Sequence, residues 1–243
     1  MPLGPQVAAR RPPLRQMLKI LQTLLIGALA LCPSMALAGV PNGTWLSQPQ
    51  IRFYASQNAL DQVMKDIQSQ GYRLVFLDFR SVTDEVQEQV SQQARNHNLI
   101  PIAWIQSPQH RSLTIEQIIN EARHTDGLQV DDHFFANYSA RDFERLANQY
   151  RKFIFCSIQP FQRNLLPRYG CNQIDVQCYS SPTFRQCLNL ANQLNAVVSL
   201  YEKDTFKYRG QIGGKTFNVF LWPYTNQRIS NTGNFRVRGF ANL

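Results

Sequence analysis

Eight short apolar runs recur along this chain, separated by longer polar and amphipathic stretches. The runs are GTWL (43–46), RLVFLDF (73–79), LIPIAWIQ (99–106), DGLQVDDHF (126–134), KFIFCSI (152–158), QIDVQCYS (173–180), AVVSLYE (196–202) and TFNVFLWPY (216–224). Apolar runs of this length that alternate with helical stretches are typical of βα units around a parallel sheet. Eight such units predict a compact, single-domain (βα)8 TIM barrel.

The stretches between the runs carry the helical part of this prediction. Residues 58–70 and 83–98 have apolar positions at three- and four-residue spacing, and Gly71 follows the first stretch as a stop signal. An open, doubly wound sheet is the alternative architecture. No glycine-rich loop follows the first run, so the dinucleotide-binding version of that fold has no means of holding a pyrophosphate, and we expect no cofactor.

Residues 1–38 show the features of a secretory signal peptide in the usual order. Basic residues come first, an apolar stretch runs from Ile20 to Leu31, and Ala36-Leu37-Ala38 fits the small-residue rule for cleavage. We therefore predict a signal peptide over 1–38 and a periplasmic or secreted domain over 39–243. Translation from Met17 would give a signal of ordinary length.

Two other interpretations of this N-terminal region stay open. A lipoprotein would be anchored at Cys32, although Leu31 stands where lipoproteins have a small residue. An uncleaved anchor would need about 20 apolar residues, and the apolar stretch is shorter than that. No second stretch of that length occurs, so we expect no stable membrane span after cleavage.

The basic charge of the full chain comes partly from this region. The whole sequence has 25 basic and 16 acidic residues and a net charge of +9. Four of the basic residues and none of the acidic ones lie in 1–38, which leaves +5 for the mature domain. Its remaining basic residues form no block, so we expect no nucleic-acid partner.

Four cysteines remain after cleavage: Cys156, Cys171, Cys178 and Cys187. An even number of cysteines in an exported domain predicts disulfides, and three pairings are open. Cys178 would be the free one if it is buried against a helix. A zinc site lacks both a CxxC pair and a neighbouring histidine, so we predict no metal.

The carboxyl ends of the strands are where a TIM barrel places its active site. Side chains alternate along a strand, so Gln129 and Asp131 are expected to face inward because Leu128 and Val130 suit the helix layer. The same parity in the sixth and eighth runs turns one set of side chains toward the interior or the mouth: Asp175, Gln177, Tyr179, Asn218, Phe220 and Trp222. Asp78, Trp104 and Gln106 lie at the ends of the second and third runs.

Carboxylates, amides and aromatic rings at one mouth are what a carbohydrate cleft needs. Acids and amides bind sugar hydroxyls, and aromatic rings stack on apolar sugar faces. We therefore predict a glycan partner, with Trp222, Tyr179 and Gln177 among the residues that bind it. The alternative is that Asp131 and Asp132 cap the following helix and that Trp222 fills the barrel.

These residues also carry a resemblance to a known family. TDGLQVDDHFF (125–135) resembles the VDGIhFDDYFY signature of the bacterial glycosyl-hydrolase-like barrels of the cell envelope. SIQPF (157–161) is similar to that family's SIsPFg segment, and DVQCYS (175–180) to its D-x-x-x-Q-x-Y segment. Similarity to chitinase-type barrels is weaker, because His133 stands at the place of their catalytic glutamate.

The resemblance implies roles for individual residues. Asp131 is expected to be the catalytic carboxylate, and Asp132 a neighbour that positions it or shifts its pKa, with its side chain toward the helix layer. Glu202, at the end of the seventh run, is the expected second carboxylate and Asp78 its substitute. His133 is expected to be a structural or substrate-orienting residue rather than a base, and Trp104 and Asp78 are expected to bind substrate.

Three functions follow from these expectations. The first is an exported glycoside hydrolase acting on a cell-wall or extracellular glycan through strand-end carboxylates. The second is a catalytically inactive glycan-binding barrel of the cell envelope. The third is a structural or assembly protein whose polar residues at the strand ends are only the wet rim of a barrel.

Overall fold

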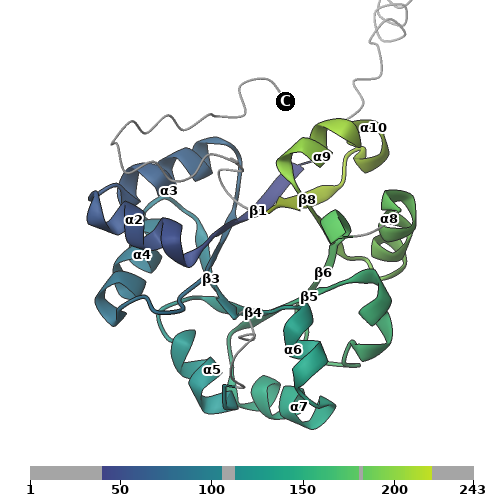
Figure 1. Cartoon of the computed structure of the whole chain (residues 1–243), viewed down its shortest axis with the longest axis horizontal. Helices are drawn as coiled ribbons and strands as arrows, with labels where there is room; N and C mark the ends of the chain where they lie inside the picture. The colour runs from purple at the N-terminus through teal and green to yellow at the C-terminus, as the bar shows by residue number, and fades with distance from the viewer. Residues whose placement is uncertain (1–39, 106–112, 181–182, 221–243) are drawn as a thin grey trace, which may run out of the picture. The chain divides into compact units, whose positions relative to one another are not determined.

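The computed structural model describes residues 40–105, 113–180 and 183–220, all of them within the unit Ala38–Leu243. Eight parallel strands close into a barrel in sequence order, and β1 pairs with both β2 and β8 (Figure 1). The predicted (βα)8 TIM barrel is confirmed. The strands are β1 (Val40–Leu46), β2 (Leu74–Leu77), β3 (Ile100–Ile105), β4 (Gly127–Val130), β5 (Phe153–Ile158), β6 (Gln173–Gln177), β7 (Val197–Leu200) and β8 (Thr216–Val219).

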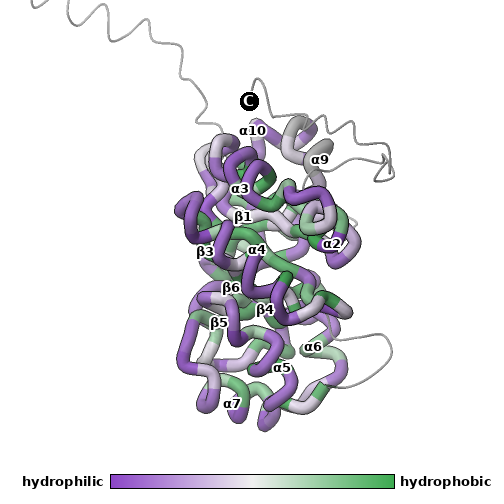
Figure 2. Tube along the Cα trace, turned by 90° about the vertical axis from the view of Figure 1, so that its left-hand side faces the viewer, coloured by the Kyte–Doolittle hydropathy of each residue, from purple (hydrophilic) through white to green (hydrophobic). Residues whose placement is uncertain are grey.

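Helices surround this barrel and are amphipathic, since hydrophilic and hydrophobic residues alternate along them (Figure 2). Both helices predicted from periodicity are present, and Gly71 ends the first of them with a positive φ of 87°. The helices are α2 (Gln48–Ser56), α3 (Leu60–Ser69), α4 (Asp84–Asn96), α5 (Ile115–Glu121), α6 (Asp132–Asn137), α7 (Ala140–Gln149), α8 (Phe184–Gln193), α9 (Glu202–Lys207) and α10 (Arg209–Ile212). None of the described helices has the length and apolar character that crossing a membrane requires.

Strand side chains divide between two cores. Leu128 and Val130 pack in the large cluster between strands and helices, as the parity of the fourth strand predicts. Gln129 faces the interior, where its Oε1 accepts a hydrogen bond from Trp45 Nε1 at 2.8 Å. The second cluster fills the barrel itself with the apolar side chains of Trp45, Leu74, Phe76, Ile102, Trp104 and Phe155.

The connection from β5 to β6 departs from the regular repeat. It contains a short 3₁₀ helix, η1 (Pro160–Leu165), in place of an α-helix. A disulfide between Cys156 of β5 and Cys171 links the two ends of this connection. The cross-link restrains a segment that has no helix to pack against the sheet.

A second disulfide joins the end of β6 to the helix that follows the strand. It links Cys178 to Cys187 of α8, and both half-cystines are buried. The predicted disulfides are thus confirmed, with the pairings that the sequence left open, and Cys178 is not free. Two disulfides indicate an oxidising environment.

Candidate active site

Asp131 follows β4 directly and begins the next helix. Its Oδ1 accepts hydrogen bonds from the backbone N–H groups of His133 at 3.0 Å and Phe134 at 3.3 Å, so it is the N-cap of α6. The side chain is buried at the carboxyl end of β4. Asp131 therefore caps a helix and also lies where TIM barrels place catalytic groups.

Asp132 lies differently from the prediction. Its carboxylate points over the strand ends, where Oδ2 accepts from Gln159 Nε2 at 2.6 Å and Oδ1 accepts from Gln177 Nε2 at 3.1 Å. The expectation that this side chain faces the helix layer is wrong. The reason is that Asp132 is the first residue of α6, so the two-residue alternation of a strand no longer applies to it.

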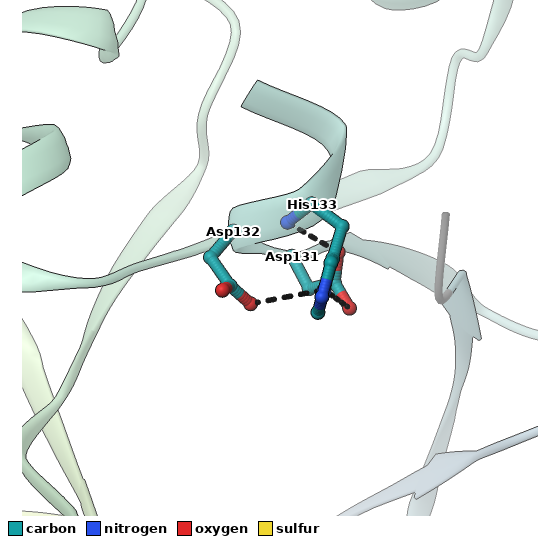
Figure 3. Close-up of side chains that lie close together, drawn as sticks. All are labelled: Asp131, Asp132 and His133. Carbon is teal, nitrogen blue, oxygen red and sulfur yellow. Dashed lines mark hydrogen bonds and ion pairs between the residues drawn. The ribbon is translucent and has the colours of Figure 1, made fainter. Parts of the chain in front are cut away.

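His133 lies between the two carboxylates (Figure 3). Its Nδ1 is 3.6 Å from Asp131 Oδ2 and 3.4 Å from Asp132 Oδ1. The side chain is 48% exposed, whereas that of Asp131 is only 5% exposed. The three residues thus present an accessible imidazole that rests on two largely buried carboxylates.

The electrostatics follow from this arrangement. Burial raises the pKa of the Asp131 carboxyl above its usual range, against the opposing effect of His133. The carboxylate of Asp131, followed by that of Asp132, raises the pKa of His133 to about 9. At neutral pH the imidazole is therefore protonated, and it is the counter-ion of the acidic pair.

The same three residues are the metal-capable group in the part of the chain that the structure describes. One ligand atom from each of Asp131, Asp132 and His133 lies within 4.8 Å of the others. These atoms already have protein partners, since Asp131 caps α6 and Asp132 accepts from two amides. A divalent ion would have to displace the proton of His133 and some of these hydrogen bonds.

Aromatic rings occupy the other side of the mouth. Phe220, directly after β8, stacks on Tyr179 with ring centroids 4.9 Å apart. Trp104 and Trp45 contact the ring of Phe220 edge-on, with centroids 5.7 Å and 5.5 Å from it. The ring centroid of Tyr201 is 6.1 Å from that of Phe220. Trp104 and Tyr179, each predicted to bind substrate, thus both contact Phe220.

Asp78, predicted as a substrate residue, is fully buried at the end of β2. Its oxygens accept from Arg80 Nε at 2.9 Å, from Arg80 Nη2 at 2.7 Å and from the backbone N–H of Gln48 at 3.3 Å. The carboxylate therefore holds a half-exposed guanidinium at the mouth and the start of α2. It is not grouped with Asp131 by any of these contacts.

Three predicted residues cannot be placed in the site. Glu202 begins α9, after the end of β7 at Leu200, and its side chain lies outside the described residues. Trp222 also lies outside them, as does Gln106. Residues 106–112, 181–182 and 221–243, which come after β3, β6 and β8 in the sequence, are outside the part of the chain that the structure describes.

Sequence reasoning missed three residues that build the site. Gln159 and Gln162 follow β5, and Gln162 Nε2 donates to the backbone oxygen of Asp132 at 2.8 Å. Ser157 accepts from Gln177 Nε2 at 3.2 Å. Parity along the fifth strand places Ser157 and Gln159 on the inward face, so the signal was present in SIQPF but was used only for the resemblance.

Comparisons with known proteins identify the fold. No family model matches the chain, and no curated protein matches it. A truncated 3-deoxy-D-arabino-heptulosonate 7-phosphate synthase from Thermotoga maritima is similar in structure, with a TM-score of 0.55, 10% identity, and 79% of this chain and 78% of that chain covered. A protein described as QR15, an aldolase, has a TM-score of 0.52 and 9% identity over 76% of this chain and 92% of its own.

These findings correct the predicted function. The two similar barrels named above are a synthase and an aldolase, not glycoside hydrolases, and identities of 9–10% show the fold alone. The resemblance to the glycosyl-hydrolase-like family has no support from a family model. The predicted glycoside hydrolase and its glycan-binding alternative are wrong, and the reason is that acids and aromatic rings at a barrel mouth occur with many chemistries.

Proposed function

We propose that this protein is an enzyme that catalyses proton transfer on a small polar molecule bound at the carboxyl end of the barrel. His133 is the acid, and Asp131 is the carboxylate that supports it. The observation that carries the proposal is the position of His133 Nδ1, within 3.6 Å of Asp131 Oδ2 and 3.4 Å of Asp132 Oδ1. Ionisable groups with perturbed pKa values at this end of a barrel are candidates for acid–base catalysis.

The ring geometry assigns the nitrogens of His133 to different tasks. Nδ1 faces the carboxylates of Asp131 and Asp132, so Nε2 is on the far side of the ring and is the nitrogen for the substrate. With a pKa of about 9 the imidazolium is a proton donor at neutral pH. After the transfer the ring is a base, and Asp131 stabilises the charged form when the proton returns.

The surroundings support a small substrate with one apolar face and several polar groups. Amide groups of Gln159 and Gln177 lie on one side of the acidic pair. The rings of Tyr179, Tyr201 and Phe220 lie on the other side of the mouth and are partly exposed. Ligand sites of this kind combine an apolar wall with a few placed polar groups.

The same proposal includes a location. Two disulfides in the barrel suit an oxidising compartment, and residues 1–38 have the composition of a signal peptide. The enzyme would then act in the periplasm or after secretion, as a mature domain that begins near Gly39. Mass determination of the N-terminus of the exported protein tests this.

The experiment is a turnover screen with matched histidine variants. Pools of small carbonyl, hydroxy and amino compounds are incubated with the protein in D2O and followed by NMR for deuterium incorporation or conversion. His133→Asn should lower turnover by about 10²–10⁴-fold, the usual contribution of a general acid. His97→Asn is the control, because His97 pairs with Asp61 at 2.8 Å on the outer surface.

Two results would overturn the proposal. One is a His133→Asn variant as active as the wild type on every compound that is converted. The other needs no substrate: NMR titration of His133 should give a pKa near 9, and a pKa near the ordinary value of 6.5 would show that the acid–base pair is absent.

A further inference from the structure

A carboxylate outside the predicted site lies inside the barrel below Gln177. Asp175, on β6, is fully buried and accepts hydrogen bonds from three strands. The donors are Ser157 Oγ of β5 at 2.6 Å, Ser199 Oγ of β7, and Asn218 Nδ2 of β8 at 3.1 Å. No cation among the described side chains forms an ion pair with it, so hydroxyl and amide groups alone hold this carboxylate.

We propose that Asp175 is a positioning residue for the candidate active site and acts through Ser157 and Gln177 to hold Asp132. The contacts are continuous from the barrel interior to the mouth. Ser157 Oγ donates to Asp175, and Gln177 Nε2 donates both to Ser157 Oγ at 3.2 Å and to Asp132 Oδ1 at 3.1 Å. That oxygen of Asp132 is the one beside His133, so the importance of the relay for catalysis rests on the proposed function.

The direction of each hydrogen bond follows from the charge on Asp175. An ionised carboxylate can only accept, and a serine hydroxyl has one proton to give. Because Ser157 gives its proton to Asp175, its oxygen is an acceptor for Gln177. This arrangement selects the orientation in which the NH2 group of Gln177, and not its oxygen, faces both Ser157 and Asp132.

An amide in place of the carboxylate cannot satisfy the same neighbours. If the NH2 group of Asp175→Asn faces Ser157, the serine must turn its proton toward Gln177, which also presents donors. If it faces Asn218, two NH2 groups meet. Asn218 cannot turn to relieve this without losing the bond that its Oδ1 accepts from Asn42 Nδ2 at 3.1 Å.

The test follows the pKa of His133 by NMR in a double-mutant cycle. Asp175→Asn should lower it by roughly half a unit or more, because Asp132 loses a donor that holds it beside the imidazole. In a Ser157→Ala background the same change should have little further effect, since the link is already broken. In a Ser199→Ala background it should keep its effect, because the hydroxyl of Ser199 donates to Asp175 Oδ1, whereas the link to Gln177 runs through Ser157 and Asp175 Oδ2.

The serine pair keeps the proposal testable if Asp175→Asn does not fold. Each serine gives one hydroxyl donor to Asp175, so a merely structural role predicts equal effects for their alanine variants. The proposal expects Ser157→Ala to lower the pKa of His133 and Ser199→Ala to leave it unchanged.

An unchanged pKa of His133 in Asp175→Asn, or equal effects of that change in both serine backgrounds, would overturn the proposal. The proposed acid–base function and the relay are tested by separate measurements. If His133 has an ordinary pKa in the wild type, acid–base catalysis fails, and the relay is then judged by the side-chain NH2 signals of Gln177. They should change in Asp175→Asn and in Ser157→Ala, and change less in Ser199→Ala, whose residue is a strand neighbour of Gln177 but not a link of the relay.

Discussion

Replacement of Asp175 by asparagine should make the free energy of unfolding less dependent on pH. Burial raises the pKa of this carboxyl from the usual 3.8 to about 6, although the donors Ser157, Ser199 and Asn218 act in the opposite direction. The native protein therefore binds the proton more tightly than the unfolded chain does. It follows that the wild type loses stability as the pH rises through this range.

The magnitude comes from the difference between the two pKa values. A gap of about two units, at 1.36 kcal/mol each, means that ionised Asp175 lowers the free energy of unfolding by about 3 kcal/mol above pH 6. Below about pH 4 the group is protonated in both states, and this contribution vanishes. The asparagine in Asp175→Asn does not titrate. The free energy of unfolding of the wild type minus that of the variant should therefore fall by about 3 kcal/mol between pH 4 and pH 7.

Urea unfolding at 25 °C with the disulfides intact measures this difference. Asp142→Asn is a control of opposite sign, because hydrogen bonds from Ser139 lower the pKa of exposed Asp142. Asp142 stabilises the fold above its unfolded pKa and stops doing so as the pH falls, so its difference curve should rise with pH. A flat or rising curve for Asp175 would refute the reasoning, since the three donors would then equal or outweigh burial.

Two further predictions concern the scaffold. Replacing both Cys178 and Cys187 by serine should lower the free energy of unfolding by roughly 2–4 kcal/mol, measured in urea without reductant, because α8 is no longer tied to β6. Gly127→Ala should cost roughly 1–3 kcal/mol in the same assay, because its Cβ would lie 2.7 Å from the backbone oxygen of Phe153. Gly210→Ala, with nothing within 4 Å, should leave stability nearly unchanged.

The barrel could be predicted from the sequence because each strand is buried on both faces and each helix on one. The strands therefore read as near-continuous apolar runs, and the helices as a 3.6-residue pattern. The segment after β5 could not be predicted in the same way. Its 3₁₀ helix has no such pattern, and the disulfide that restrains it could be paired in three ways.

The site could be predicted only as far as each strand continues. Parity placed Gln129 and Gln177 on the inward face, and the structure agrees. It failed for Asp132, which starts a helix, where successive side chains turn by about 100° instead of 180°. Glu202 likewise begins a helix, although the sequence placed it at the end of a strand.

The function could not be inferred from residue types, and the reason lies in the hydrogen bonds. The DD pair of the fourth strand suggests two free carboxylates. In the structure Asp131 caps α6, and Asp132 is held by Gln159 and Gln177. Which atoms stay accessible depends on these distant partners, so the imidazole of His133 is the more exposed group.

The unequal halves of the barrel interior bear on why Asp175 is buried there. On one side the strands contribute Trp45, Phe76, Trp104 and Phe155, together with the neutral amide of Gln129, which accepts a hydrogen bond from Trp45. On the other side an ionised carboxylate is held by neutral donors, an arrangement that lowers the free energy of unfolding by about 3 kcal/mol above pH 6. Apolar side chains of similar volume would make the barrel more stable, so stability does not explain this residue. Its contact with Asn218 leads on to Asn42 near the start of β1, whereas the contact with Ser157 continues to the mouth. The cost in stability and the route of the hydrogen bonds therefore lead to the same explanation, that this carboxylate serves the site.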